Sequence, residues 1–154
     1  MVKSILAFVW AVLGGYVFAV LTYSQLNLNR LVDLGVALAL GDRLTTAFHD
    51  LLGMPVYLFV IAVALLIAFA IAGLVIRWVP HLRTLGFVLA GAMGMFAMIM
   101  FFKVFMGTNP IAVTRTPTGL VSQCAAGALA GFIFVVASRA LSLIHISEPT
   151  RHRR

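Results

Sequence analysis

Four stretches of the chain are apolar for eighteen or more residues, and shorter polar or basic segments separate them. At about 1.5 Å rise per residue, each stretch can cross the roughly 30 Å hydrocarbon core of a bilayer as a helix. The stretches lack the alternation of apolar and polar residues that is typical of β-barrel strands. The pattern therefore predicts an all-α membrane protein, a four-transmembrane-helix antiparallel bundle with spans at about 5–22, 56–76, 85–106 and 120–137.

The long connection between the first and second spans has weaker, amphipathic patterns. Apolar residues follow a helical spacing over 44–52, and Asp42 precedes them as a candidate N-cap. We expect an amphipathic helix over 43–52, on the membrane surface or at the mouth of the bundle. The pattern also predicts a second short helix over about 28–40, which Gly35 interrupts. One or two short helices therefore separate the first two spans.

Proline and threonine mark where other helices begin. Pro55 stands at the start of the second span, where its missing N–H costs nothing. Thr116 and Pro117 combine a hydroxyl cap with a first-turn proline before the fourth span. The connection over 77–84 is tight and basic, so the second and third spans are predicted to form an antiparallel hairpin.

Small residues recur along every span. Because the hydrophobic effect does not drive helices together in lipid, close backbone contact through small residues is a main source of helix association. These stripes predict either packing inside one bundle or contact with a second copy or a larger membrane complex. The positions are Ala7, Ala11, Gly15 and Ala19; Ala64, Ala68 and Ala72; Gly86, Ala90 and Gly94; and Gly127 with Gly131.

The last fourteen residues, 141–154, differ from the rest of the chain. The segment over 141–151 reads LSLIHISEPTR and resembles the translation of a transposon-end adapter used in sequencing libraries. We therefore expect a non-native tail after a single integral membrane domain over 1–140. Without the tail's three arginines and its glutamate, eight basic and three acidic residues remain, a formal charge of +5 in place of +7.

Composition and charge support a membrane location. The chain is 63% hydrophobic and 10% charged, too apolar for a soluble domain of its size. Its basic residues are spread over all connections, which is typical of headgroup anchoring and does not indicate nucleic-acid binding. Outside the tail, four basic residues lie on each side of the predicted bundle. The short basic loop over 77–83 favours cytoplasmic termini. The two sets are Lys3, Arg77, Arg83 and Arg139, and Arg30, Arg43, Lys103 and Arg115.

Residue types that carry chemistry are few. Cys124 is the single cysteine, which excludes a thiol relay and favours a packing role. His49 and His81 belong to connections on opposite sides, and no His, Cys or carboxylate cluster has metal-ligand spacing. We therefore expect no catalytic residues, no metal site and no cofactor, and we do not expect an enzyme.

A group of polar residues near the start of the fourth span is the candidate site. Lys103, Asn109, Arg115 and Gln123 are predicted to lie towards one mouth of the bundle. Arg115 and the helix N-terminus could bind an anion or a polar solute there. Alternatively, the basic side chains snorkel to headgroups, and Gln123 forms a hydrogen bond with a neighbouring helix.

The chain also resembles a group of four-span inner-membrane proteins of bacteria for which no activity is established. The resemblance covers most of residues 1–139 and is carried by SQLNLNRLVDLG, GDRLTTAFHDLLGM and NPIAVTRTPTGLVSQCAAG. It implies a multi-pass protein of the bacterial inner membrane. The resemblance implies no activity. The small-residue stripes and the polar residues leave two functional hypotheses: a non-enzymatic accessory or scaffold protein that packs by these stripes, or a transporter or channel component with a solute site near Arg115.

Overall fold

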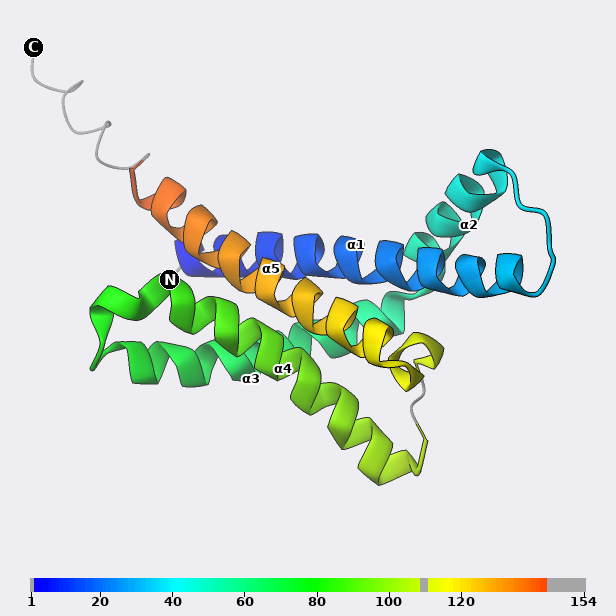
Figure 1. The fold of residues 1–154 in the computed structure, drawn as a ribbon. Coiled ribbons are helices and arrows are strands. Elements are labelled where there is room, and N and C mark those ends of the chain that lie inside the picture. The colour runs from blue at the N-terminus through cyan, green and yellow to red at the C-terminus, as the bar shows by residue number, and fades with distance from the viewer. Residues whose placement is uncertain (1, 109–110, 144–154) are drawn as a thin grey trace, which may run out of the picture.

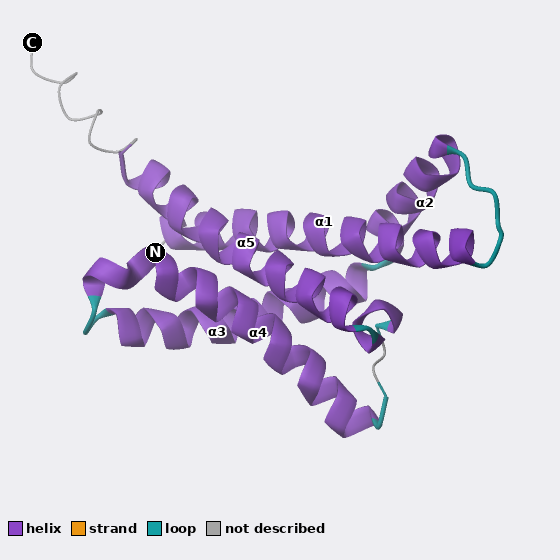
Figure 2. Cartoon of the chain, viewed as in Figure 1, coloured by secondary structure: helices purple, strands orange, loops and turns teal. Residues whose placement is uncertain are grey.

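The computed structural model describes residues 2–108 and 111–143. These residues form five α-helices joined by loops and two short 3-10 helices (Figure 2). This confirms the predicted all-α fold class. The elements are α1 (Val2–Asp33), α2 (Leu40–Gly53), α3 (Pro55–Ile76), η1 (Pro80–Leu82), α4 (Arg83–Met106), η2 (Ala112–Arg115) and α5 (Pro117–Leu143).

Four of these helices, α1, α3, α4 and α5, are long and apolar enough to cross a membrane. Only 22–39% of the residues in the most apolar window of each are buried, so most of their apolar side chains face outward. A soluble protein rarely exposes apolar surface on this scale. The chain is therefore a small multi-pass membrane protein whose outer surface is solvated by lipid.

The first helix is longer than predicted, and this changes the connection that follows it. α1 continues without interruption to Asp33, and Gly35 adopts a left-handed conformation with φ +89° in the turn beyond it. The predicted helix over 28–40 is therefore wrong, since its first residues belong to α1 and residues 34–39 form a loop. Extending an existing helix avoids the cost of nucleation, so the polar residues after the span remain helical.

α2 confirms the short helix between the first two spans, with different bounds. It begins at Leu40. Asp42 lies inside the first turn, where its carboxylate accepts a hydrogen bond from the backbone N–H of Ala39 at 3.0 Å. The prediction of Asp42 as the N-cap is therefore wrong, because a carboxylate at the third helical position reaches back to the N-cap residue.

The two helix starts predicted from proline and threonine agree with the structure. Pro55 is the first residue of α3, and Pro117 is the first residue of α5. The Thr116 hydroxyl accepts a hydrogen bond from the backbone N–H of Gly119 at 3.3 Å, as expected of a cap. Gly107, with φ +71°, ends α4 in the left-handed conformation that glycine adopts without strain.

α5 is the central helix of the bundle. It lies between α1 and α4 and packs against both, while α4 also packs against α3 (Figure 1). Arg83 donates to the Ser138 hydroxyl at 3.0 Å, and Arg139 donates to the Thr84 hydroxyl at 3.1 Å. The start of α4 therefore meets the last turns of α5 near the N-terminus of α1, and we call this the termini end. α2 and η2 lie at the opposite end, the α2 end.

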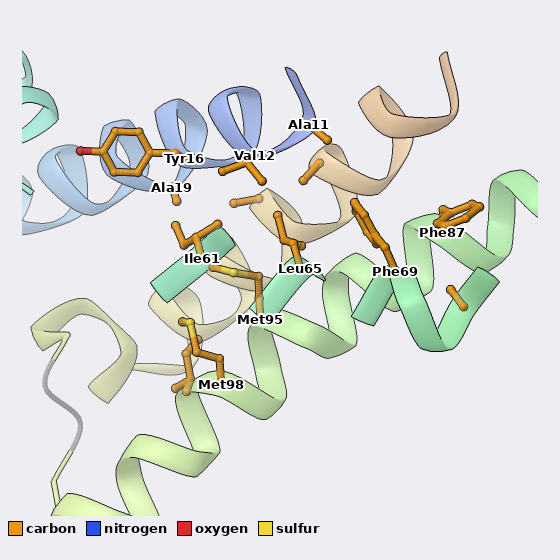
Figure 3. Close-up of a cluster of buried hydrophobic side chains, with 14 of the residues drawn as sticks. Ala11, Val12, Tyr16, Ala19, Ile61, Leu65, Phe69, Phe87, Met95 and Met98 are labelled. Carbon is orange, nitrogen blue, oxygen red and sulfur yellow. The ribbon is translucent and has the colours of Figure 1, made fainter. Parts of the chain in front are cut away.

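The interior is a cluster of buried apolar side chains from all four spans (Figure 3). Phe69, Phe87 and Phe134 form its aromatic part, with ring centroids 4.8–5.6 Å apart. Ala11 and Ala19 of α1 have no exposed surface. Small side chains on α1 therefore allow α5 to approach its backbone closely.

Candidate functional site

Gln123 of α5 is completely buried, and its side-chain amide joins three helices. The Tyr57 hydroxyl of α3 donates a hydrogen bond to Gln123 Oε1 at 2.6 Å. Gln123 Nε2 donates to the backbone carbonyl of Ala19 in α1 at 3.1 Å. A carbonyl can only accept, so the NH₂ group must face Ala19 and the amide oxygen must face Tyr57. Both ends of this buried amide therefore have partners.

Tyr16 of α1 connects the same region to α2. Its hydroxyl donates to the backbone carbonyl of Leu51 at 2.7 Å and lies 3.3 Å from that of Met54. The last carbonyls of a helix have no partner inside it, so Tyr16 satisfies one of those left by α2. The rings of Tyr16 and Tyr57 have centroids 6.4 Å apart. We call Tyr16, Tyr57 and Gln123 the polar cluster.

Close approach of α1 and α5 explains how Gln123 reaches the backbone of another helix. A Cβ atom added at Gly15 would lie 2.8 Å from the Cβ of Ala130 and 3.4 Å from the carbonyl oxygen of Ala126. Ala126 and Ala130 are buried opposite the stripe of α1. The small residues thus bring the two backbones close enough for a glutamine side chain to span the gap.

The structure separates the predicted site residues. Gln123 lies in the interior with Tyr57 and Ala19 as its partners, whereas the Lys103 and Arg115 side chains are exposed on α4 and η2. Asn109 lies outside the described residues. The arrangement corresponds to the alternative in which Gln123 bonds a neighbouring helix.

Two tyrosines complete the site, and neither is among the residues that the sequence places in it. Tyr57 binds Gln123 directly, whereas Tyr16 contacts the ring of Tyr57 and binds the end of α2. A tyrosine within an apolar helix needs a hydrogen-bond partner for its hydroxyl, and this was the sequence signal that could have placed both tyrosines in the site.

Ser24 of α1 is also buried, and within residues 2–108 and 111–143 its hydroxyl has no hydrogen-bond partner.

Arginines at the α2 end stabilise the second half of α1. Arg43 of α2 donates to the side-chain oxygens of Gln25 at 3.2 Å and Asn29 at 2.9 Å. Arg30 donates to the Thr116 hydroxyl at 3.0 Å, at the start of α5. The polar residues of the long connection therefore hold α2 and the start of α5 against α1.

The small residues singled out from the sequence lie where helices of the same chain meet. At Gly127, an added Cβ would collide with the carbonyl oxygen of Gly91. At Gly94, it would lie 2.8 Å from the Cβ of Ala68. The contacts are Gly15 with Ala130, Ala68 with Gly94, Gly127 with Gly91, and Gly131 with Phe87.

The polar cluster offers two phenols and one amide and contains no carboxylate, imidazole or thiol. No group of three or more His, Cys, Asp or Glu side chains that could hold a metal lies within the described part of the chain. Its hydroxyl and amide groups are instead hydrogen-bonded across α1, α3 and α5 and the end of α2. Chemically, the cluster can stabilise contacts between these helices.

Comparisons of the chain with protein-family models, curated proteins and solved structures found no match. The bacterial resemblance therefore stays a prediction. The function of the protein must therefore be inferred from its fold and from its exposed surfaces.

Proposed function

We propose that this small multi-pass protein is a non-enzymatic accessory protein that binds an integral-membrane partner through α2. We also propose a bacterial inner-membrane location with both termini in the cytoplasm. The sequence resemblance supports this membrane, and the basic 77–83 loop supports the orientation. The protein's role would be to hold its partner in place, without chemistry of its own.

The apolar stripe on the outer face of α2 carries this proposal. Its four large side chains are 63–79% exposed and recur every fourth residue, so they share one helix face. The opposite face packs inward through Ala47, which is buried, and through Leu51. A row of apolar side chains with this spacing is the surface by which helices dock into grooves. We call Leu40, Leu44, Phe48 and Leu52 the α2 stripe.

Two features support a protein partner for this stripe. α2 is held at both ends, since Arg43 binds side chains of α1 near its start and Tyr16 binds its last turn. The part of α1 beyond Ala19 comprises 14 helical residues, roughly 20 Å. α2 contacts α1 and is inclined to it (Figure 1). α2 is therefore a fixed surface near the end of the bundle.

The small-residue stripes support the same choice of surface. The stripes of α1 and α5 are used in contacts within the chain, since a Cβ added at Gly15, Gly127 or Gly131 would meet atoms of a neighbouring helix, and little space remains there for another chain. The stripes of α3 and α4 meet each other where Gly94 contacts Ala68. We therefore propose the α2 stripe, in place of the small-residue stripes, as the surface that contacts the partner.

The size of the native complex in mild detergent tests the proposal. We expect the wild-type protein to migrate in an assembly above monomer mass, together with a second membrane protein that mass spectrometry identifies. Phe48→Asp should release the chain as a folded monomer, because it puts a charge into the apolar contact. The control Thr45→Asp, at an exposed position on the same helix, should leave the assembly intact. A wild-type monomer, or an assembly that survives Phe48→Asp, would refute the proposal.

Transport is the competing hypothesis, and a separate measurement addresses it. The accessory role predicts that proteoliposomes containing the purified chain show no more phosphate or chloride uptake than protein-free vesicles. Uptake that is present in the wild type and lost in Arg115→Ala would favour the solute site near Arg115 and overturn the accessory role.

A further inference from the structure

An apolar groove of about 760 Å³ runs between α3 and α4 on the outer surface of the bundle. Every residue that lines it is apolar or glycine. Its floor includes Ala68 and Gly94, while Ile67, Ile71 and Phe101 form part of its walls and are 57–62% exposed. We call this feature the apolar groove.

The groove is long and narrow. On α3 it extends from Phe59 to Ile76, about 25 Å along the helix axis. Contact between Ala68 and Gly94 brings the two helices together at the floor, so the larger side chains on either side form the walls. This shape suits a single extended hydrocarbon chain better than a compact solute.

One end of the groove leads to two arginines. Ile76 and Gly86 line that end; Arg77 directly follows α3, and Arg83 is the first residue of α4. Both side chains are exposed, and Arg83 donates one hydrogen bond to Ser138, which leaves other donors of its guanidinium. The N-terminus of α4, with its partial positive charge, lies at the same place.

Charge is distributed unevenly between the two ends of the molecule. Within the part of the chain that the structure describes, Lys3, Arg77, Arg83 and Arg139 lie at the termini end, and no Asp or Glu accompanies them. The described acidic residues, Asp33, Asp42 and Asp50, all lie at the α2 end. An anion beside the groove at the termini end would therefore meet only positive side chains, which attract anionic lipids at a membrane surface.

We propose that the apolar groove binds an acyl chain of an anionic phospholipid whose phosphate is bound by Arg77 and Arg83. The groove supplies the apolar contact area. The guanidinium groups supply planar, charge-assisted hydrogen bonds to the phosphate oxygens. Trp78 is 88% exposed beside Arg77, where an indole ring lies among lipid headgroups. This site is separate from the α2 stripe and does not depend on the proposed accessory role.

Native mass spectrometry of the detergent-solubilised chain tests the site. The probes are phosphatidylglycerol and phosphatidylcholine with identical acyl chains, added at equal concentration. We expect one tightly retained phosphatidylglycerol per chain and at least tenfold weaker retention of phosphatidylcholine. Arg77→Gln should weaken phosphatidylglycerol binding roughly tenfold, since it removes a charged donor. The matched control Arg43→Gln, at the α2 end, should leave binding unchanged.

Variants that fill the groove distinguish lipid binding at this site from nonspecific attraction of anionic lipids to a basic surface. Ala90→Phe fills the floor, and Ile67→Trp fills the groove from an exposed wall position if the first variant fails to fold. Neither changes the charge, yet each should abolish the retained phosphatidylglycerol. Equal retention of both lipids, or phosphatidylglycerol binding that survives a folded groove-filling variant, would overturn the proposal. A dimer that the same variants dissociate would also overturn it, because a second copy would then occupy the groove.

Discussion

α4 packs against two neighbours in different ways. Against α5 the contact is between backbones, because Gly91 and Gly127 each face the carbonyl oxygen of the other. Against α3 the helices touch where Gly94 meets Ala68, and a groove remains along the outer side of that contact. A short connection joins α3 to α4 in the chain, yet α4 packs more extensively against α5. Proximity in sequence thus does not determine how extensively two helices pack, whereas the size of the facing residues determines how closely their backbones approach.

This difference indicates where an added side-chain atom should destabilise the bundle and where it should not. The α4–α5 contact has no space for an extra atom, and Gln123 adds hydrogen bonds from α5 to α1 and α3. The outer face of α3 includes Gly73, where an added Cβ would meet no atom within 4 Å. Substitutions of equal size should therefore have opposite effects on stability at the two places.

The largest effect should come from Gly127→Ala. The new Cβ would collide with the carbonyl oxygen of Gly91, so α4 and α5 must separate, at a cost of about 1–3 kcal/mol of unfolding free energy. The matched control Gly73→Ala adds the same atom in open space and should be neutral or stabilising by up to about 1 kcal/mol. Denaturant unfolding in detergent micelles measures both. Equal effects of the two variants would contradict the contrast between the two contacts.

The next largest effect should come from Gln123→Leu. The change removes the partner of the half-buried Tyr57 hydroxyl and the hydrogen bond to Ala19, at a cost of about 1–2 kcal/mol. The same unfolding assay on Tyr57→Phe and on the double variant gives the coupling between the two side chains. We expect the double variant to be less destabilised than the sum of the single variants. Full additivity would mean that the two side chains do not interact.

A smaller, local effect is expected for Tyr16→Phe. Without its hydroxyl, the carbonyl of Leu51 loses a hydrogen-bond donor and the end of α2 is less firmly held. A loss of about 1 kcal/mol corresponds to roughly fivefold faster amide hydrogen exchange over residues 40–53. Thr22→Val is the control, because the Thr22 hydroxyl bonds only to carbonyls of its own helix. Unchanged exchange in α2 after Tyr16→Phe would show that Tyr16 does not hold this helix.

Much of the fold follows from the sequence alone. Runs of apolar residues located the four spans, and Pro55 and the Thr116–Pro117 pair located two helix starts, because these signals are local. The extension of α1 to Asp33 was missed, since polar residues can either end a helix or continue it. Extending an existing helix avoids the cost of nucleation, and tertiary contacts add to this, here the hydrogen bonds of Arg43 and Arg30.

The candidate site was less predictable, for a geometric reason. Sequence position indicates the depth of a residue in the membrane, and Lys103, Arg115 and Gln123 were grouped on that basis. It does not indicate which way each side chain faces around the bundle. Gln123 faces the interior between α1 and α3, whereas Lys103 and Arg115 face outward. The partner of Gln123, Tyr57, comes from α3, and their hydrogen bond depends on how the helices are arranged around each other, which no local pattern encodes.

The central claim is that the small-residue stripes pack helices of one chain against each other. Disulfide formation between Gly15→Cys and Ala130→Cys tests this most directly, in a Cys124→Ala background and in intact membranes. A Cβ added at Gly15 would lie 2.8 Å from that of Ala130. A disulfide needs about 3.5–4.5 Å between these atoms, so the helices must separate by about 1 Å to form it. We predict a rapid, complete cross-link within the monomer. Cross-linked dimers, or no cross-link at all, would contradict the claim.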